Sequence, residues 1–334
     1  MLVTGASGFL GRNVLRALGD TPEVEVVAAC RSAGNLPAGF GGEVRVGDLL
    51  DPGYRRDVVA GIGVVCHAAS SASMWGHGPL ESERFLAPTQ DLIDQAIGAG
   101  VRRFVQTSTV AVGRVGRDGG PHGDADPTER TGYWPHLDRL IEIDRYMEAH
   151  SGRGTQMVTL RLGHFVGAGN RLGLLPALLP RLRTHLVPWL ARGRSRLPLV
   201  ADTDLGRAFA LAAVAGELAD YESFNICGPD FPTLREVVEF VATETGLPRP
   251  HFSVPYPAGY AFGWLMEKLN PVLPGSSPFL TRSIVRLAED WVCPGDAAEK
   301  KLGYVPQGDW RSAVRAQVAE LRAEGYPWIP LSQL

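Results

Sequence analysis

Short apolar runs alternate with longer amphipathic stretches over the first half of the chain. The runs are typical of strands buried on both faces, and the stretches between them have helical spacing. The expected strands are Leu2–Thr4, Val24–Cys30, Glu43–Val46, Gly63–Cys66, Phe104–Thr107 and Met157–Leu162. The expected helices are Phe9–Leu18, Glu81–Ala99 and Leu137–Ala149. Strands that alternate with helices predict an α/β fold with a doubly wound parallel sheet.

A different pattern begins after Gly163. Residues 172–196 are rich in Leu, Arg and Pro, Leu234–Thr245 has helical spacing, and Pro255–Phe279 is crowded with aromatic residues and prolines. We expect residues 1–165 to form the sheet domain, with a return segment near 200–228. Residues 166–334 are expected to form most of a smaller, more irregular substrate-binding subdomain.

The composition excludes several classes of protein. Hydrophobic residues make up 45% of the 334 residues and charged residues 21%, which is typical of a folded globular chain. A net charge of −3 argues against a nucleic-acid partner. The most apolar stretch, Val254–Leu273, contains prolines, Glu267 and Lys268, so we expect no membrane partner and a cytoplasmic location. The four cysteines lack metal-binding spacing, so we expect no metal and no disulfide framework.

Three glycines follow the first expected strand with the spacing GxxGxxG. Gly5 permits a tight turn, Gly8 lets the backbone approach a pyrophosphate, and Gly11 lets the helix pack closely on the strand. Free N–H groups at the start of the helix attract the anion. This context predicts a Rossmann-type dinucleotide-binding domain. The loop residues expected to bind the cofactor are Gly5, Ser7, Gly8, Phe9, Leu10 and Gly11.

The residue that follows the second strand predicts which dinucleotide binds. An NAD site places an acidic residue about 20 positions beyond the glycine loop, where it binds the ribose hydroxyls. This chain has Arg31 there, followed by Ser32. A guanidinium pairs well with a phosphate group, so Arg31 and Ser32 favour NADP(H), although an arginine at a strand end can also be a solvated surface residue.

Several motifs in order resemble the extended short-chain dehydrogenases/reductases of the epimerase/dehydratase and 3β-hydroxysteroid dehydrogenase type. The matching segments are Thr4–Gly11, Gly47–Leu49, Val65–Ala69, Phe104–Thr109, Leu160–Gly163, Phe224–Gly228 and Ala298–Pro306. The resemblance implies that Asp48 meets the adenine and that the strand end around Ala68 lies under the cofactor ribose. The further cofactor-binding residues that it implies are Leu49, Ala69, Ser70, Thr107, Leu162, Gly163 and Phe165.

The chain departs from this family at its catalytic pair. The family reduces ketones with a Tyr-x-x-x-Lys pair, but His136 stands in the tyrosine register and Leu140 in the lysine register. No lysine occurs before Lys268, so no shift of register supplies one. Thr109 and the adjacent Ser108 remain as candidate catalytic residues. His136 is a third candidate, because an imidazole can donate a proton near neutral pH. Leu140 gives it no partner, so we expect His136 to have a structural role at the helix terminus.

Three functions are compatible with an intact cofactor site that lacks this pair. The first is a ketoreductase whose substrate supplies the proton from a phenolic hydroxyl peri to the ketone. The second is a non-redox enzyme of the same fold, although Thr109 lacks the Asp-Glu pair that follows it in the family's sugar-nucleotide dehydratases. The third is a non-enzymatic NADP sensor.

The departures resemble those of tailoring ketoreductases of aromatic polyketide pathways in antibiotic biosynthesis. This resemblance implies an NADPH-dependent oxidoreductase with an angucyclinone-type small-molecule substrate. Loops at the carboxyl ends of strands form the ligand crevice of such folds. The side chains that we expect to contact a planar substrate are Met74, Trp75, Tyr133 and Trp189.

Overall fold

Seven parallel strands form the central sheet of the computed structural model, which describes residues 1–70, 73–114, 120–270 and 278–325. The strands are β1 (Leu2–Thr4), β2 (Val27–Cys30), β3 (Glu43–Val46), β4 (Val64–His67), β5 (Arg103–Thr109), β6 (Gln156–Leu162) and β10 (Tyr221–Ile226). Their order is β10-β6-β5-β4-β1-β2-β3, and each neighbouring pair is parallel. The direction of winding reverses between β1 and β4, which opens a crevice at the carboxyl ends of the strands. The predicted Rossmann-type sheet is confirmed.

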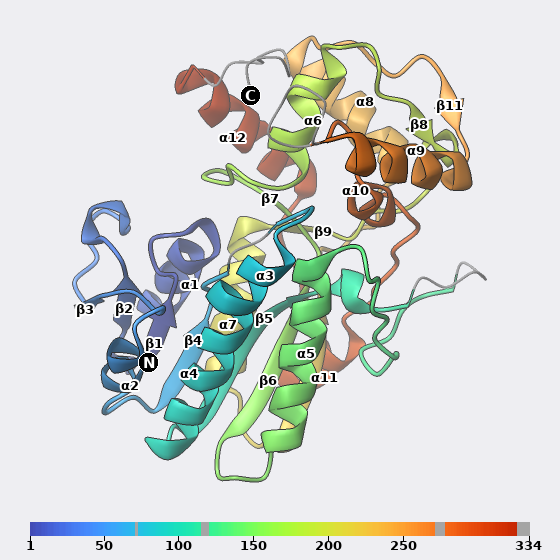
Figure 1. Cartoon of the computed structure of the whole chain (residues 1–334). Helices are drawn as coiled ribbons and strands as arrows, with labels where there is room; N and C mark the ends of the chain where they lie inside the picture. Colours follow the sequence, from blue (N-terminus) through green and yellow to red (C-terminus); the bar gives the residue numbers. More distant parts are fainter. Residues whose placement is uncertain (71–72, 115–119, 271–277, 326–334) are drawn as a thin grey trace.

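Helices cover both faces of the sheet (Figure 1). One face packs against α1 (Phe9–Gly19), α7 (Asp202–Val214) and α11 (Asp296–Leu302), and the other against α2 (Pro52–Val58), α4 (Ala87–Gly98) and α5 (Pro135–His150). Successive strand residues point to opposite faces. Val3 therefore packs in the core with α1 and α7, whereas its neighbour Leu2 packs in the core with α4 and α5.

The helix expected over Glu81–Ala99 is broken into three parts. It consists of α3 (Gly78–Glu81), a π-helical turn η2 (Ser82–Leu86) and α4. Pro88 gives the physical reason: it has no N–H to donate, and its ring would clash with the carbonyl group of Arg84 in a regular helix. The resulting π turn buries Phe85 against α5.

The second half of the chain contains more helix than its sequence pattern suggests. Apart from the elements that join the main sheet, it contains α6 (Leu174–Leu182), β8 (Trp189–Leu190), α8 (Leu234–Thr245), β11 (Ser253–Val254), α9 (Tyr256–Leu269), α10 (Arg282–Leu287) and α12 (Trp310–Ala323). Two short strands, β7 (His164–Val166) and β9 (Leu199–Ala201), pair beside the main sheet. The predicted helix Leu234–Thr245 is confirmed at both ends; it begins with a capping box between Thr233 and Glu236. Residues 271–277 and 326–334 of the expected subdomain lie outside the described residues.

The chain crosses between the two halves more than once. Residues 200–228 contribute α7 and β10 to the sheet domain, and α11 returns to pack against β10. Trp291 and Cys293 also lie in the core beneath α5. All four cysteines are buried and unpaired.

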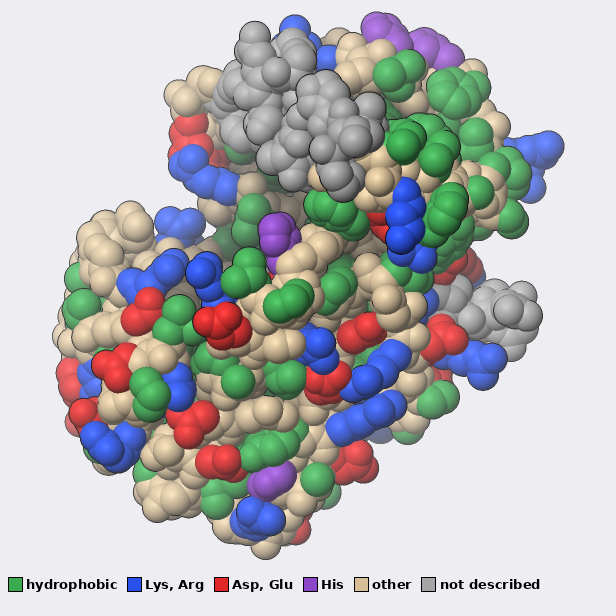
Figure 2. Space-filling model, in the orientation of Figure 1, with side chains coloured by type: hydrophobic (Ala, Val, Ile, Leu, Met, Phe, Trp, Pro, Cys, Tyr) green, Lys and Arg blue, Asp and Glu red, His purple; other side chains and the backbone are tan. Residues whose placement is uncertain are grey.

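The surface is mixed in character. Basic and acidic side chains are interspersed on the face seen in Figure 2, and apolar side chains gather over α9, where Phe262 and Trp264 are exposed. In the parts of the chain that the structure describes, no helix is long and apolar enough to span a membrane.

Candidate active site

The backbone of the glycine loop between β1 and α1 leaves no room for a Cβ atom at two of its glycines. Gly5 has a φ of 62°, and a Cβ there would lie 2.7 Å from the backbone of Ala69. A Cβ at Gly11 would lie 2.2 Å from the Gly5 carbonyl oxygen. The Gly8 N–H closes the turn by donating to that oxygen at 2.9 Å. No side chain caps α1, so the N–H groups of its first turn remain available to an anion. These features fit a dinucleotide pyrophosphate.

His67 fixes the end of β4 beneath this loop. Its Nδ1 lies 2.8 Å from the Thr4 hydroxyl, and its Nε2 lies 3.3 Å from the Thr89 hydroxyl. Burial lowers the pKa of His67 to about 4, so the ring is neutral at physiological pH. The Thr107 hydroxyl donates to the His67 carbonyl oxygen at 2.8 Å. These bonds hold the strand end that precedes Ala68, Ala69 and Ser70.

The residues expected at the adenosine follow β2 and β3. Arg31 and Ser32 are exposed directly after β2. Asp48 is also exposed, and its carboxylate accepts the Leu50 N–H at 3.0 Å. The Gly47 N–H donates to the Cys30 carbonyl oxygen at 3.1 Å, which brings the two strand ends together. The Leu49 carbonyl accepts from Arg55 at 2.6 Å.

The cofactor residues expected at and after the end of β6 differ in which of their atoms a ligand could contact. The side chain of Leu162 is fully buried, so this residue can meet a ligand only through its backbone. A Cβ at Gly163 would lie 2.0 Å from the Pro198 carbonyl oxygen, which explains the glycine. The Phe165 ring lies 6.1 Å from that of Phe9 and therefore borders the start of α1.

Thr109 and Ser108 point in opposite directions at the end of β5, because strand side chains alternate. Thr109 is partly exposed, and its hydroxyl accepts the Ala111 N–H at 3.3 Å. Ser108 is buried, and its hydroxyl has no hydrogen-bond partner among the described residues. Both remain predictions, but one ligand cannot meet both hydroxyl groups from the same face.

His136 has an acidic partner that its local sequence does not reveal. Its Nδ1 lies 3.0 Å from a carboxylate oxygen of Glu81, and both side chains are buried. Its Nε2 lies 3.5 Å from the Ser70 hydroxyl, and the Phe85 ring packs 5.0 Å away. Leu140, one turn further along α5, is buried and apolar.

Glu81 is not among the residues that the sequence singled out, although a weak signal for it is present. Glu81, Phe85 and Thr89 follow one another at four-residue spacing, and all three are buried. A carboxylate on the buried face of an amphipathic stretch indicates a polar partner in the interior. The sequence does not reveal that this partner lies 55 residues away.

Met74 and Tyr133 both adjoin the start of α10. The Ser283 hydroxyl donates to the Met74 carbonyl oxygen, and the Arg282 guanidinium lies 4.4 Å from the centre of the Tyr133 ring. Met74 is 38% exposed, and Trp75, beside it, is partly buried. These expected substrate residues therefore border one region at the carboxyl ends of the strands.

Trp189 lies elsewhere. Its side chain is 6% exposed in the core of the C-terminal half, and the Arg235 guanidinium covers its ring at 4.2 Å. This packing differs from the expected role of Trp189 in a substrate wall. The sequence could not distinguish the two roles, because an aromatic residue in a Leu- and Arg-rich segment looks the same whether it packs in the protein core or lines a substrate site.

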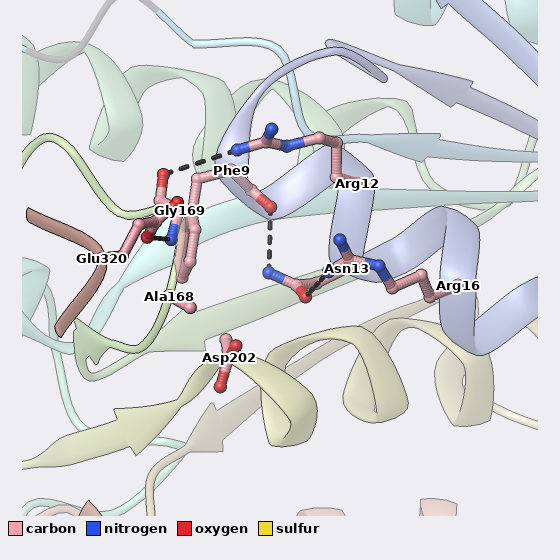
Figure 3. Close-up of a pocket in the computed structure, with 8 residues that line it drawn as sticks. All are labelled: Phe9, Arg12, Asn13, Arg16, Ala168, Gly169, Asp202 and Glu320. Carbon is pink, nitrogen blue, oxygen red and sulfur yellow. Dashed lines mark hydrogen bonds between the residues drawn. The ribbon is translucent and has the colours of Figure 1, made fainter. Parts of the chain in front are cut away.

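A small pocket of about 130 Å³ lies on the flank of α1 (Figure 3). Phe9, Arg12, Asn13 and Arg16 come from α1, and Ala168, Gly169, Asp202 and Glu320 complete the lining. The Gly169 backbone crosses this pocket: its carbonyl accepts from Arg12, and its N–H donates to Glu320. The charged lining is unsuited to a planar apolar ketone. No cluster of three or more metal-ligating side chains occurs in the described ranges.

Comparison with known proteins decides the family. Residues 1–227 match the model of the NAD dependent epimerase/dehydratase family. The chain belongs to this family. The family match and the geometry of the glycine loop together indicate that the protein is an NAD(P)-dependent oxidoreductase or a related enzyme.

Two curated relatives are ketone reductases. The chain is 27% identical over 324 residues to a 2-alkyl-3-oxoalkanoate reductase of Stenotrophomonas maltophilia, covering 92% of this chain and 94% of the relative. It is 24% identical to the 4-hydroxy-2-methyl-3-oxo-4-farnesyl-3,4-dihydroquinoline-1-oxide ketoreductase of Stigmatella aurantiaca, covering 90% of each.

Among solved structures, a DesIV double mutant (dTDP-glucose 4,6-dehydratase) from Streptomyces venezuelae with NAD bound has a TM-score of 0.74. It is 22% identical and covers 97% of this chain and 98% of its own. At this identity the likeness shows the fold alone.

Proposed function

We propose that this protein is an NADPH-dependent ketoreductase that acts on an aromatic polyketide ketone of the angucyclinone type in antibiotic biosynthesis. The observation that carries the proposal is which residues occupy the first two turns of α5. His136 and Leu140 stand in the registers of the family's Tyr and Lys, while the glycine loop retains the geometry of a dinucleotide site. In this respect the chain resembles the angucyclinone ketoreductase of simocyclinone biosynthesis.

The glycine loop and Arg31 would hold NADPH, which would supply the hydride for the ketone carbon. The carbonyl oxygen then needs a proton, and Leu140 cannot support a donor as a lysine would. A phenolic hydroxyl peri to the ketone meets this need: it polarises the carbonyl group, donates its proton and leaves a resonance-stabilised phenolate. We expect such a planar ring system to bind in the region bordered by Met74, Trp75 and Tyr133.

NADPH is the proposed reductant because of Arg31. Its guanidinium is exposed directly after β2, the position from which a side chain reaches the adenosine ribose. A 2′-phosphate there can accept two parallel hydrogen bonds from Arg31.

The direct test follows NADPH oxidation by the purified protein in the presence of hydroxylated aromatic ketones. We expect oxidation that depends on both the ketone and the protein. If NADPH binds but no ketone is reduced, the non-redox alternative is favoured. If no nucleotide binds, the ketoreductase and the NADP sensor are both excluded.

A further inference from the structure

We propose that His136 and Glu81 form a proton relay that restores the substrate's phenolic hydroxyl as it gives its proton to the ketone oxygen. The relay rests on the proposed ketoreductase function. In it, His136 is a catalytic residue that contacts the substrate's phenolic oxygen, and Glu81 is a positioning residue that acts through His136.

The pair is assembled from separate elements. Glu81 ends α3, immediately before the π turn η2, and His136 lies in the first turn of α5. The exposed fractions of the two side chains are 8% for His136 and 3% for Glu81. Burying such a pair carries a desolvation penalty, and well-packed apolar residues would hold the two helices as well or better. Buried ionisable pairs beside a ligand crevice are therefore candidates for function.

The hydrogen bond defines which nitrogen exchanges protons. The Glu81 carboxylate accepts from Nδ1–H at 3.0 Å, so Nδ1 is engaged and the ring is held in one orientation. The other nitrogen, Nε2, faces the Ser70 hydroxyl at 3.5 Å, a distance at the long limit of a hydrogen bond. Ser70 is exposed at the carboxyl end of β4, beside Ala68 and Ala69. Nε2 is thus the atom of the buried pair that lies toward the crevice.

Among the described residues, Glu81 is the charged side chain that contacts the His136 ring. From η2, the apolar ring of Phe85 packs 5.0 Å from the imidazole. On α5, Leu140 is apolar, and the Asp138 carboxylate is occupied by the N–H groups of Thr131 and Gly132.

The proposed step conserves both protons and electrons. Hydride addition turns the ketone oxygen into a base, and that oxygen takes the proton of the peri hydroxyl. The phenolic oxygen takes the proton on Nε2 of protonated His136, so the phenol is restored and the imidazole becomes neutral. Solvent returns one proton to His136 before the next turnover. The net reaction consumes one NADPH, one ketone and one proton, and it yields NADP⁺ and the alcohol.

The kinetic test uses a tetralone with a hydroxyl peri to its ketone. In the wild type, kcat should fall as pH rises, because a neutral imidazole held at Nδ1 has no proton to give at Nε2. His136→Gln should lower kcat about 10- to 150-fold, the loss of one charge-assisted hydrogen bond, and should remove this pH dependence with little change in KM. Glu81→Gln keeps an acceptor for Nδ1–H but removes the charge, so it should change the pH profile while the fold is retained.

Matched controls lie on the same helix. His150→Gln and Glu142→Gln replace the same residue types at the far end of α5 and at its Arg139 ion pair, and both should leave kcat and its pH profile unchanged. Thermal unfolding and NADPH binding of each variant identify any loss of fold. Wild-type kcat and pH dependence in a folded His136→Gln variant would overturn the relay and leave the ketoreductase function standing.

An equilibrium measurement tests the same contact without turnover. The phenol of peri-hydroxytetralone, bound together with NADP⁺, is titrated by the absorbance of its phenolate. The relay predicts that the phenolate forms over a different pH range in the wild-type complex than in the His136→Gln complex, because only the wild type places an imidazole against the phenolic oxygen. Identical titrations would contradict the relay. A shifted titration without any NADPH oxidation would support the contact and refute the ketoreductase function. Failure of the tetralone to bind would refute both.

Discussion

Arg31 and His67 both lie at the carboxyl ends of strands, but Arg31 is exposed to solvent and His67 is buried. Arg31 is exposed after β2, where it is available to a ligand. His67 is enclosed by Thr4 and Thr89 at the end of β4, where it fixes the backbone under the glycine loop. Residue type and strand position made Arg31 a candidate from sequence. The same information does not fix the protonation state of His67, because burial determines it.

Arg31→Ala tests the choice of cofactor. Loss of a charge-assisted hydrogen bond to the 2′-phosphate should weaken NADPH binding about 10- to 150-fold and leave NADH binding nearly unchanged. Fluorescence titration with both nucleotides measures the two affinities. Arg153→Ala, an exposed arginine after α5, is the matched control and should affect neither. Equal weakening of both nucleotides by Arg31→Ala would contradict the assignment.

His67 predicts a pH dependence of stability. Its pKa is about 4 in the folded protein against 6.5 for an unburied ring, so the unfolded chain binds more protons between these values. Stability is therefore fully present above about pH 6.5 and is lost as pH falls toward 4, by up to about 1.4 kcal/mol per pH unit. Urea unfolding at several pH values, compared between the wild type and His67→Gln, isolates this contribution. Parallel curves for the two proteins would show that His67 is not buried as a neutral ring.

Elements with strong local signals could be predicted, and elements shaped by distant contacts could not. The strand Glu43–Val46 and the helix Leu234–Thr245 have the expected bounds. The break between α3 and α4 was missed, because helical spacing continues through Glu81–Ala99 although Pro88 disrupts the backbone ladder. The pairing of Glu81 with His136 depends on that break and on the docking of α5. Its geometry therefore lies beyond what a local pattern specifies.

The close approach of α1 and α7 gives a prediction at the scale of elements. A Cβ at Gly206 in α7 would lie 2.3 Å from the Asn13 carbonyl oxygen in α1, so Gly206→Ala must push the helices apart. We expect a loss of about 1–3 kcal/mol in the free energy of unfolding, measured in urea. Gly19→Ala, at the end of α1, meets no atom within 4 Å and should be neutral or slightly stabilising. Equal effects of the two substitutions would contradict the packing described here.

At the scale of the whole molecule, the candidate site draws on both halves of the chain. The loop after β4 is tied to α10 through Ser283, and Arg282 of the same helix covers Tyr133. The family model ends at residue 227, whereas the two curated reductases match 90% or more of the chain. The expected substrate residues Met74 and Tyr133 thus contact α10, which lies beyond the matched family region. The expected cofactor residues come from local sequence motifs, whereas the expected substrate residues are brought together by contacts between segments about 150–210 residues apart.

The most direct test of the proposed reaction compares two substrates that differ by one methyl group. Reduction of peri-hydroxytetralone and of its peri-methyl ether by NADPH is measured with the same purified wild-type protein. The ether has no proton to donate and cannot yield a phenolate, so its kcat/KM should fall at least about 100-fold, the contribution of a positioned acid. Unsubstituted tetralone, which is smaller than either, controls for the bulk of the methyl group and should be equally poor. Efficient reduction of the methyl ether would contradict the account and return the proton donor to the protein.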